Sequence, residues 1–186
     1  VPGLVWGLVK DGRLVHVCAM GVQTVDGKTA VTPETAFRIA SMTKAFTGYS
    51  ILKLRDEGKL RLDDPVSKYV TEAKGWAKGI TVGDLLHHTA GFVTDDPWGD
   101  RQQPLPEAEF TRMLKAGVPF STIPGTRYEY SNFGYATLGR IIANVSKQDY
   151  AKRVEATVLK PLGMASTRYE VRDVPSDKLA IGYRWE

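Results

Sequence analysis

The sequence has 186 residues, of which 42% are hydrophobic and 25% charged, with a formal net charge of +4 at pH 7. That size and balance are typical of one soluble globular domain, or most of one. The basic residues are spread along the chain rather than clustered, so nucleic acid binding is not expected. No long apolar run is present, so no membrane span is expected, and the single cysteine excludes an internal disulfide.

The start of the chain predicts a β-hairpin over roughly residues 3–21. Two Val- and Leu-rich runs are separated there by Asp11-Gly12, a strong signal for a tight hairpin turn. A helix is predicted next, from about residue 41 to residue 57. Its residues are largely small or apolar, which suits a helix enclosed by its neighbours, and Gly58 suits the position after a helix C-terminus.

The rest of the chain predicts mostly helices. Residues 80–91 indicate a short helix that is capped near Thr81 and ends at Gly91. Apolar residues at helical spacing predict further helices over 107–116, after Asn132, and over 149–159, and the last segment, 167–186, contains short strand-like pieces.

A serine and a lysine three residues apart, Ser41 and Lys44, stand at the start of the first predicted helix. Residues at this spacing are neighbours on one helix face, so the lysine amine can reach the serine hydroxyl. The positive end of the helix dipole would also favour an anion beside Ser41. The pair is therefore either a nucleophile with its base or a helix-capping serine followed by a solvated lysine, and the spacing alone favours the cap.

A second polar group, Tyr130-Ser131-Asn132, precedes another predicted helix and follows a Pro-Gly turn. In extended backbone, side chains two residues apart point the same way, so the phenol and the amide can face one site. From these residues alone, packing is the more common use of such a tyrosine.

The adjacent histidines His87 and His88 invite a metal interpretation. Neighbouring helical residues point about 100° apart, so both rings cannot face one ion from one turn. The sequence also lacks a His-Glu-x-x-His pattern. We therefore expect no metal and no cofactor, and we expect at least one of these imidazoles to hydrogen-bond to backbone and fix a loop.

Several stretches of the chain, taken together and in their order along the sequence, resemble the serine β-lactamase and penicillin-binding protein superfamily. The closest resemblance is to the branch of class C β-lactamases, DD-carboxypeptidases, D-aminopeptidases and related esterases. It covers nearly all of the 186 residues. The matching stretches are Pro2-Gly3, Phe37 to Lys44, Leu60 with Asp63-Asp64-Pro65-Val66, Leu85 to Gly91, Pro124-Gly125 with Tyr130-Ser131-Asn132, and Pro161-Leu162-Gly163-Met164.

The resemblance implies an α/β fold of the α+β type, β-lactamase/transpeptidase-like, with a helical region packed on a partial antiparallel sheet. It implies that Ser41 is the acyl-accepting nucleophile and that Lys44 and Tyr130 relay protons. Asn132 is expected to contact the substrate amide or to hold Lys44, and Ser131 to orient the group through its backbone only. Further candidates to line the site are Asp95, Asp96, Trp98, Arg127 and Tyr135.

The family's third motif, Lys-Thr-Gly or His-x-Gly on a strand that supplies one oxyanion N–H, does not occur after Asn132. We therefore expect residues 1–186 to be the N-terminal part of a single catalytic domain. It would comprise a sheet hairpin over 1–30, a mainly helical region over 31–170, and a return toward the missing sheet over 171–186. An exposed sheet edge would favour self-association or complementation by a C-terminal segment.

These expectations favour a serine hydrolase that forms an acyl-enzyme on ester or amide substrates. An esterase, a D-amino-acid peptidase and a β-lactamase all remain open, and the partner would be a small-molecule ester, peptide or lactam. Two alternatives stand beside this hypothesis: a non-catalytic binding protein on the same scaffold, and an incomplete half that needs a second chain. The compartment is open, with a bacterial periplasmic or secreted location as the expectation.

Overall fold

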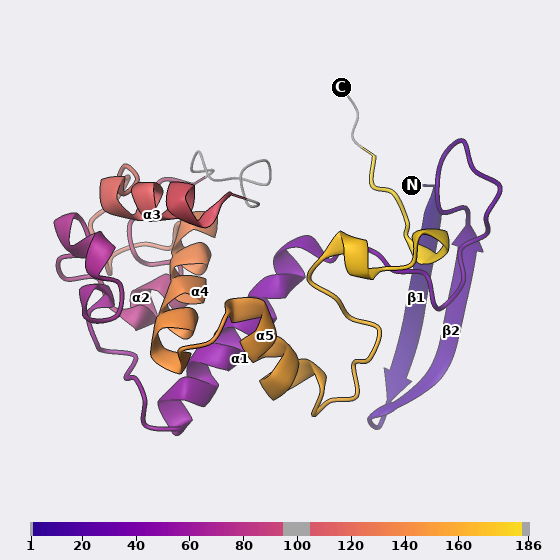
Figure 1. Cartoon of the computed structure of the whole chain (residues 1–186), viewed down its shortest axis with the longest axis horizontal. Helices are drawn as coiled ribbons and strands as arrows, with labels where there is room; N and C mark the ends of the chain where they lie inside the picture. Colours follow the sequence, from indigo (N-terminus) through magenta and orange to yellow (C-terminus); the bar gives the residue numbers. More distant parts are fainter. Residues whose placement is uncertain (1, 95–104, 184–186) are drawn as a thin grey trace. The chain divides into compact units, whose positions relative to one another are not determined.

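The structure is a computed structural model that describes residues 2–94 and 105–183. The chain divides into two compact units (Figure 1). One unit combines Val1–Ser41 with Gly163–Glu186, and the other is Met42–Leu162. Among the described residues, no helix has the length and apolar character needed to cross a membrane.

The first unit contains the predicted hairpin. Strand β1 (Gly3–Lys10) pairs antiparallel with β2 (Arg13–Gly21), and the register shifts once, between Leu8 and Val9. The two turn residues both have positive φ, 51° at Asp11 and 72° at Gly12, as a type I′ turn requires. The prediction of a hairpin over residues 3–21 is therefore confirmed.

Apolar side chains on both faces of the hairpin are exposed. Trp6 is paired with Cys18, so Val17 next to Cys18 lies on the opposite face from Trp6. Trp6 and Val17 are 45% and 40% exposed, respectively. Other exposed apolar residues of the two strands are Leu4, Leu8, Val9, Leu14, Val15 and Met20.

The expectation of strand-like pieces in residues 167–186 is wrong for most of residues 167–183, the part of that segment that the structure describes. Short 3-10 turns occur at Val171–Asp173 and Ser176–Lys178, and the one bridge found in residues 167–183 pairs Leu179 with Ala36. The second turn begins after Pro175, which has no N–H to give to a strand ladder. Residues 184–186 lie outside the described part of the chain.

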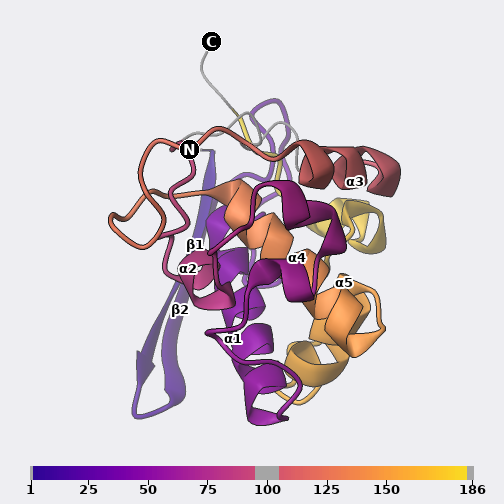
Figure 2. The same cartoon turned by 90° about the vertical axis from the view of Figure 1, so that its left-hand side faces the viewer.

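The second unit is helical. Helix α4 (Asn132–Ser146) packs against α1 (Thr43–Asp56), α2 (Val82–Leu86) and α5 (Tyr150–Val154) (Figure 2). Helix α3 is Glu107–Ala116, as predicted, and α5 continues as a π-helical turn over Glu155–Leu159. The prediction of a helix over 149–159 is thus confirmed with a change of helix type partway along.

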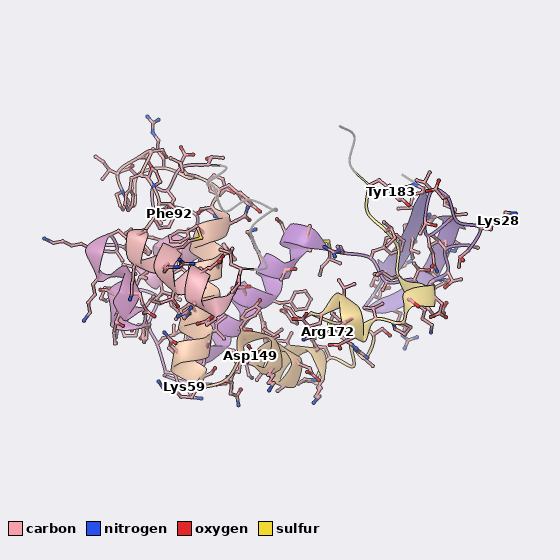
Figure 3. All side chains as sticks on the ribbon, turned by 45° about the horizontal axis from the view of Figure 1, so that its top comes forward. Lys28, Lys59, Phe92, Asp149, Arg172 and Tyr183 are labelled. Carbon is pink, nitrogen blue, oxygen red and sulfur yellow. The ribbon has the colours of Figure 1, made fainter. Side chains whose placement is uncertain are left out.

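The core of this unit lies around α4. Three aromatic rings pack against each other there: Phe92, labelled in Figure 3, has its centroid 5.4 Å from Trp76 and 5.3 Å from Phe133. The Trp76 Nε1–H donates to the Leu114 carbonyl at 2.6 Å, so the partly buried indole keeps a hydrogen-bond partner. Fully buried aliphatic residues around the rings include Ile51, Leu54, Leu85, Leu138, Ile141 and Ile142.

Two predicted helix boundaries are wrong. Helix α1 starts at Thr43, and Ser41 lies in a 3-10 turn (Ala40–Met42) ahead of it, where Ala40 has a φ of 45° that an α-helix does not accommodate. Helix α2 ends at Leu86 rather than at Gly91, because His88 adopts the left-handed conformation with φ 57°. Ser41 therefore lies in a 3-10 turn rather than in an α-helix, and His88 lies beyond the end of α2.

Candidate active site

Three of the residues singled out in the sequence converge in the second unit. The Lys44 Nζ donates to Tyr130 Oη at 2.6 Å and to Asn132 Oδ1 at 2.6 Å. The same Nζ lies 4.6 Å from the centroid of the Tyr130 ring, within the range of a cation–π contact. The structure therefore brings an amine, a phenol and an amide into one hydrogen-bonded group.

The packing of two helices places these side chains. Lys44 is in the first turn of α1, Asn132 is the first residue of α4, and the two helices pack against each other. Tyr130 comes just before Ser131, the N-cap of α4, which has extended backbone (φ −139°, ψ 121°). The expected extended geometry thus lets Tyr130 and Asn132 reach the same amine.

The side chain of Ser131 has a local task that was not expected. Its Oγ accepts a hydrogen bond from the Gly134 N–H at 3.1 Å, which satisfies one of the free N–H groups of the first turn of α4. Ser131 is only 3% exposed. The expectation that Ser131 acts through its backbone only is therefore wrong: its hydroxyl caps the helix that begins with Asn132.

The segment from His88 to Gly91 supports the loop that carries Tyr130. Carbonyl groups of this segment accept from N–H groups of the loop: His88 from Glu129 at 2.7 Å, Thr89 from Gly125 at 2.8 Å, and Gly91 from Ser121 at 2.9 Å. In addition, His88 Nδ1 accepts from the Ser131 N–H at 3.1 Å. The prediction that one of the two histidines binds backbone and fixes a loop is confirmed for His88.

His88 lies in a cluster of tyrosine rings. Its ring stacks on Tyr130 with centroids 4.8 Å apart, lies 4.9 Å from Tyr135, and meets the edge of Tyr128 at 5.4 Å. Burial lowers the pKa of His88, and the positive charge of Lys44 lowers it further. The imidazole is therefore neutral at neutral pH, and because Nδ1 accepts from Ser131, its proton is on Nε2.

Tyr135 forms another wall beside Lys44. Its ring centroid lies 5.6 Å from Lys44 Nζ, and its hydroxyl donates to the Leu86 carbonyl at 3.1 Å. Burial raises the pKa of Tyr135, and the neighbouring tyrosines Tyr128 and Tyr130 raise it further. Tyr135 therefore stays a neutral phenol whose hydroxyl is tied to backbone.

Ser41 is the last residue of the first unit. It is exposed and lies in the 3-10 turn that runs directly into α1, three residues before Lys44. Of the other lining candidates, Arg127 is exposed, and Asp95, Asp96 and Trp98 lie outside the described residues. No group of three or more His, Cys, Asp or Glu side chains suited to a metal ion occurs in residues 2–94 or 105–183.

Sequence reasoning missed His88 as a member of this group. The signals were present, since three tyrosines occur at positions 128, 130 and 135 and two histidines stand at the end of a short helix. These rings come together where His88 has a left-handed backbone conformation, whereas the sequence pattern predicted a helix as far as Gly91.

The fold is that of a known class of proteins. A family model described as Beta-lactamase matches residues 1–186, so the chain belongs to the β-lactamase family. The chain is 39% identical to Protein flp of Staphylococcus aureus (strain NCTC 8325 / PS 47), over 98% of this chain and 38% of that protein.

Solved structures agree with this assignment. The octameric penicillin-binding protein homologue from Pyrococcus abyssi matches with a TM-score of 0.86 and 33% identity, over 100% of this chain and 45% of that one. The D-alanine carboxypeptidase AmpC from Burkholderia cenocepacia matches with a TM-score of 0.82 and 31% identity, over 98% and 49%. The predicted α+β, penicillin-binding protein-like fold is thus confirmed, and the chain spans less than half the length of these relatives.

Proposed function

We propose that this chain carries the nucleophile and the proton-transfer groups of a serine hydrolase that forms an acyl-enzyme on ester or amide substrates. The observation that carries the proposal is the Lys44 amine, which is hydrogen-bonded at 2.6 Å to both Tyr130 and Asn132. A serine hydroxyl is a weak nucleophile that needs an adjacent base, and Ser41 precedes Lys44 by three residues.

In the first half of the proposed reaction, Ser41 Oγ attacks the substrate carbonyl carbon. The hydroxyl proton passes to the Lys44–Tyr130 pair, and the carbonyl oxygen becomes an oxyanion. When this intermediate collapses, the bond to the leaving group breaks, and the leaving group takes a proton back from the pair. In the second half, water attacks the carbonyl carbon of the Ser41 ester and gives up a proton to the same pair. When this second intermediate collapses, the bond to Ser41 Oγ breaks, the pair returns the proton to Ser41 Oγ, and the acid is released.

The oxyanion needs donors that this chain supplies only in part. The Ser41 backbone N–H is the proposed first donor, and the sequence has no Lys-Thr-Gly or His-x-Gly after Asn132 to supply the second. Losing one such donor costs roughly 10²–10³ in rate. Residues 1–186 by themselves are therefore expected to be weakly active or inactive.

The exposed hairpin also supports the expectation that residues 1–186 by themselves are weakly active or inactive. An isolated two-stranded hairpin is at best marginally stable in water, and this one exposes apolar side chains such as Trp6 and Val17 on both faces. We propose that further strands of the full-length protein, or a second copy, cover it. The octameric relative from Pyrococcus abyssi supports self-association as the second route.

The relatives support one substrate class as the first to test. The Burkholderia cenocepacia structure is described as a D-alanine carboxypeptidase, which makes a peptide ending in a D-amino acid the first substrate to test. Simple esters and β-lactams are the alternatives within the same chemistry. A non-catalytic binding protein on this scaffold is the alternative outside it, although such a protein would need neither Ser41 nor Lys44.

The test is covalent labelling of the full-length protein with a fluorophosphonate or a fluorescent penicillin, followed by mass spectrometry of the Ser41 peptide. We expect one adduct on Ser41, none in Ser41→Ala, and wild-type labelling in Ser176→Ala, which alters another exposed serine. The absence of an adduct with every probe would favour the binding protein, and an equal adduct in Ser41→Ala would rule out Ser41 as the nucleophile. D-alanyl peptides, p-nitrophenyl esters and nitrocefin then distinguish the substrates.

A further inference from the structure

We propose that His88 is a positioning residue, which holds Tyr130 and Asn132 in the geometry that meets Lys44. The inference deepens the proposed function and rests on it. His88 makes no hydrogen bond to Lys44 among the contacts of the described residues, so it would act through the residues that do.

The first argument is that one residue binds the backbone on both sides of Tyr130. The Glu129 N–H donates to the His88 carbonyl at 2.7 Å, and the Ser131 N–H donates to His88 Nδ1 at 3.1 Å. The left-handed backbone of His88, with φ 57°, offers both acceptors to the same segment. The two peptide groups that flank Tyr130 are therefore fixed by a single residue.

The second argument is that the imidazole ring supports the phenol itself. The ring of His88 stacks on Tyr130 at an interplanar angle of 29° and lies at 31° to the ring of Tyr135. Tyr135 is in turn anchored by its hydroxyl to the Leu86 carbonyl. Stacked rings of this kind restrict the orientation of Tyr130, and a misplacement of about 1 Å in a catalytic group can cost on the order of 10² in rate.

The hydrogen bond from the Ser131 N–H to Nδ1 requires a neutral imidazole. The titratable groups that face His88 are Lys44 from α1, Tyr128 and Tyr130 from the loop before α4, and Tyr135 from α4. A proton on Nδ1 would turn the acceptor toward Ser131 into a donor and add a second positive charge near Lys44. The Ser131 contact, one of those that hold Tyr130, is therefore lost when the pH falls below the usual histidine pKa of about 6.5.

Two substitutions in the full-length protein separate the two contacts. His88→Asn keeps an acceptor for the Ser131 N–H and tolerates the left-handed backbone, whereas His88→Phe keeps a ring but has no acceptor. His87→Asn is the matched control, because His87 is the exposed neighbour. The measurements are the rate of Ser41 labelling across pH, the melting temperature, and hydrogen exchange of the Ser131 amide.

We expect His87→Asn to label as the wild type does, His88→Asn to lose less than about 10-fold, and His88→Phe to lose on the order of 10²-fold with faster exchange at Ser131. We also expect the acid limb of the labelling profile to move to lower pH in His88→Asn, which has no imidazole to protonate. The inference is overturned if His88→Phe retains wild-type labelling and Ser131 protection, or if losses in both variants simply follow the melting temperature. If the wild type does not label at all, the proposed function fails, and exchange at Ser131 alone decides whether His88 holds the segment.

Discussion

Lys44 Nζ and Tyr130 Oη lie 2.6 Å apart although 86 residues separate them in the sequence. The contact exists because α1, which carries Lys44, packs against α4, which begins just after Tyr130. Lys44 is in the first turn of α1, and Tyr130 lies two residues before the start of α4. The amine and the phenol are thus held by the core of one compact unit.

Replacing Tyr130 by Phe tests the phenol hydroxyl. The ring that stacks on His88 is kept, while the acceptor for Lys44 is removed. We expect Ser41 labelling of the full-length protein to slow by roughly 10²–10⁴, the usual contribution of a proton-transfer group, with little change in melting temperature.

Tyr128→Phe is the control for this variant, because Tyr128 touches the same imidazole but is 64% exposed. It should label at the wild-type rate. Equal labelling of Tyr130→Phe and Tyr128→Phe would remove Tyr130 from the proposed proton relay.

Replacing Ser131 by Ala tests the cap of α4. The Gly134 N–H loses its partner, and loss of such a cap costs about 0.5–2 kcal/mol in the free energy of unfolding. Urea unfolding of the full-length protein measures the change. Ser146→Ala, at the other end of α4, removes only an exposed hydrogen bond from the Gln148 N–H at 3.3 Å and should change the free energy by less than about 0.5 kcal/mol. A similar loss in both variants would contradict the capping role.

Local signals were enough to predict some of these features. Asp11-Gly12 predicted the hairpin because few residue pairs accept two consecutive positive φ values. The cap at Ser131 could also have been predicted, because a serine directly before an apolar helical pattern is a helix start signal.

Contacts between elements far apart in the sequence could not be predicted from local residue patterns. Lys44 and Tyr130 were brought together in the sequence analysis only by resemblance to a family, because no spacing rule links positions 86 residues apart. His88 was missed for a related reason. Its left-handed backbone and its tyrosine neighbours come from tertiary packing, which outweighed the helical pattern that runs on to Gly91.

Replacing Asp64 by Asn tests the turn that joins α1 to the middle of the second unit. Hydrogen bonds from Lys68 and Tyr69 lower the pKa of Asp64 to about 2. We expect the free energy of unfolding at pH 7 to fall by about 1 kcal/mol, less than a fully buried charged hydrogen bond contributes, because Lys68 is half exposed to solvent.

The pH dependence of the Asp64 variant has a definite sign. A carboxyl whose pKa is lowered by folding stabilises the protein above its unfolded pKa, near about 3.9, and that stabilisation is lost as the pH falls toward about 2. The difference between wild type and Asp64→Asn should therefore be constant above pH 5 and shrink below about pH 4. Asp63→Asn, a change at an exposed neighbour, should have little effect, and a difference that grows in acid would contradict the assignment.

Replacing Gly91 by Ala tests the support under the Tyr130 loop. Gly91 has φ 81°, and a Cβ there would collide with the Thr122 carbonyl oxygen of the neighbouring backbone. Gly125→Ala is a matched control, because Gly125 has nearly the same φ, 80°, but open space where its Cβ would lie. We expect Gly125→Ala to cost about 1–2 kcal/mol from backbone strain, and Gly91→Ala to cost a further 1–3 kcal/mol or so from the collision. Because the loop must shift to admit the methyl group, Gly91→Ala should also slow Ser41 labelling at temperatures where the protein is still folded. Urea unfolding and labelling of the full-length protein measure both effects, and equal behaviour of the two variants would mean that the close approach at Gly91 does not hold Tyr130 in place.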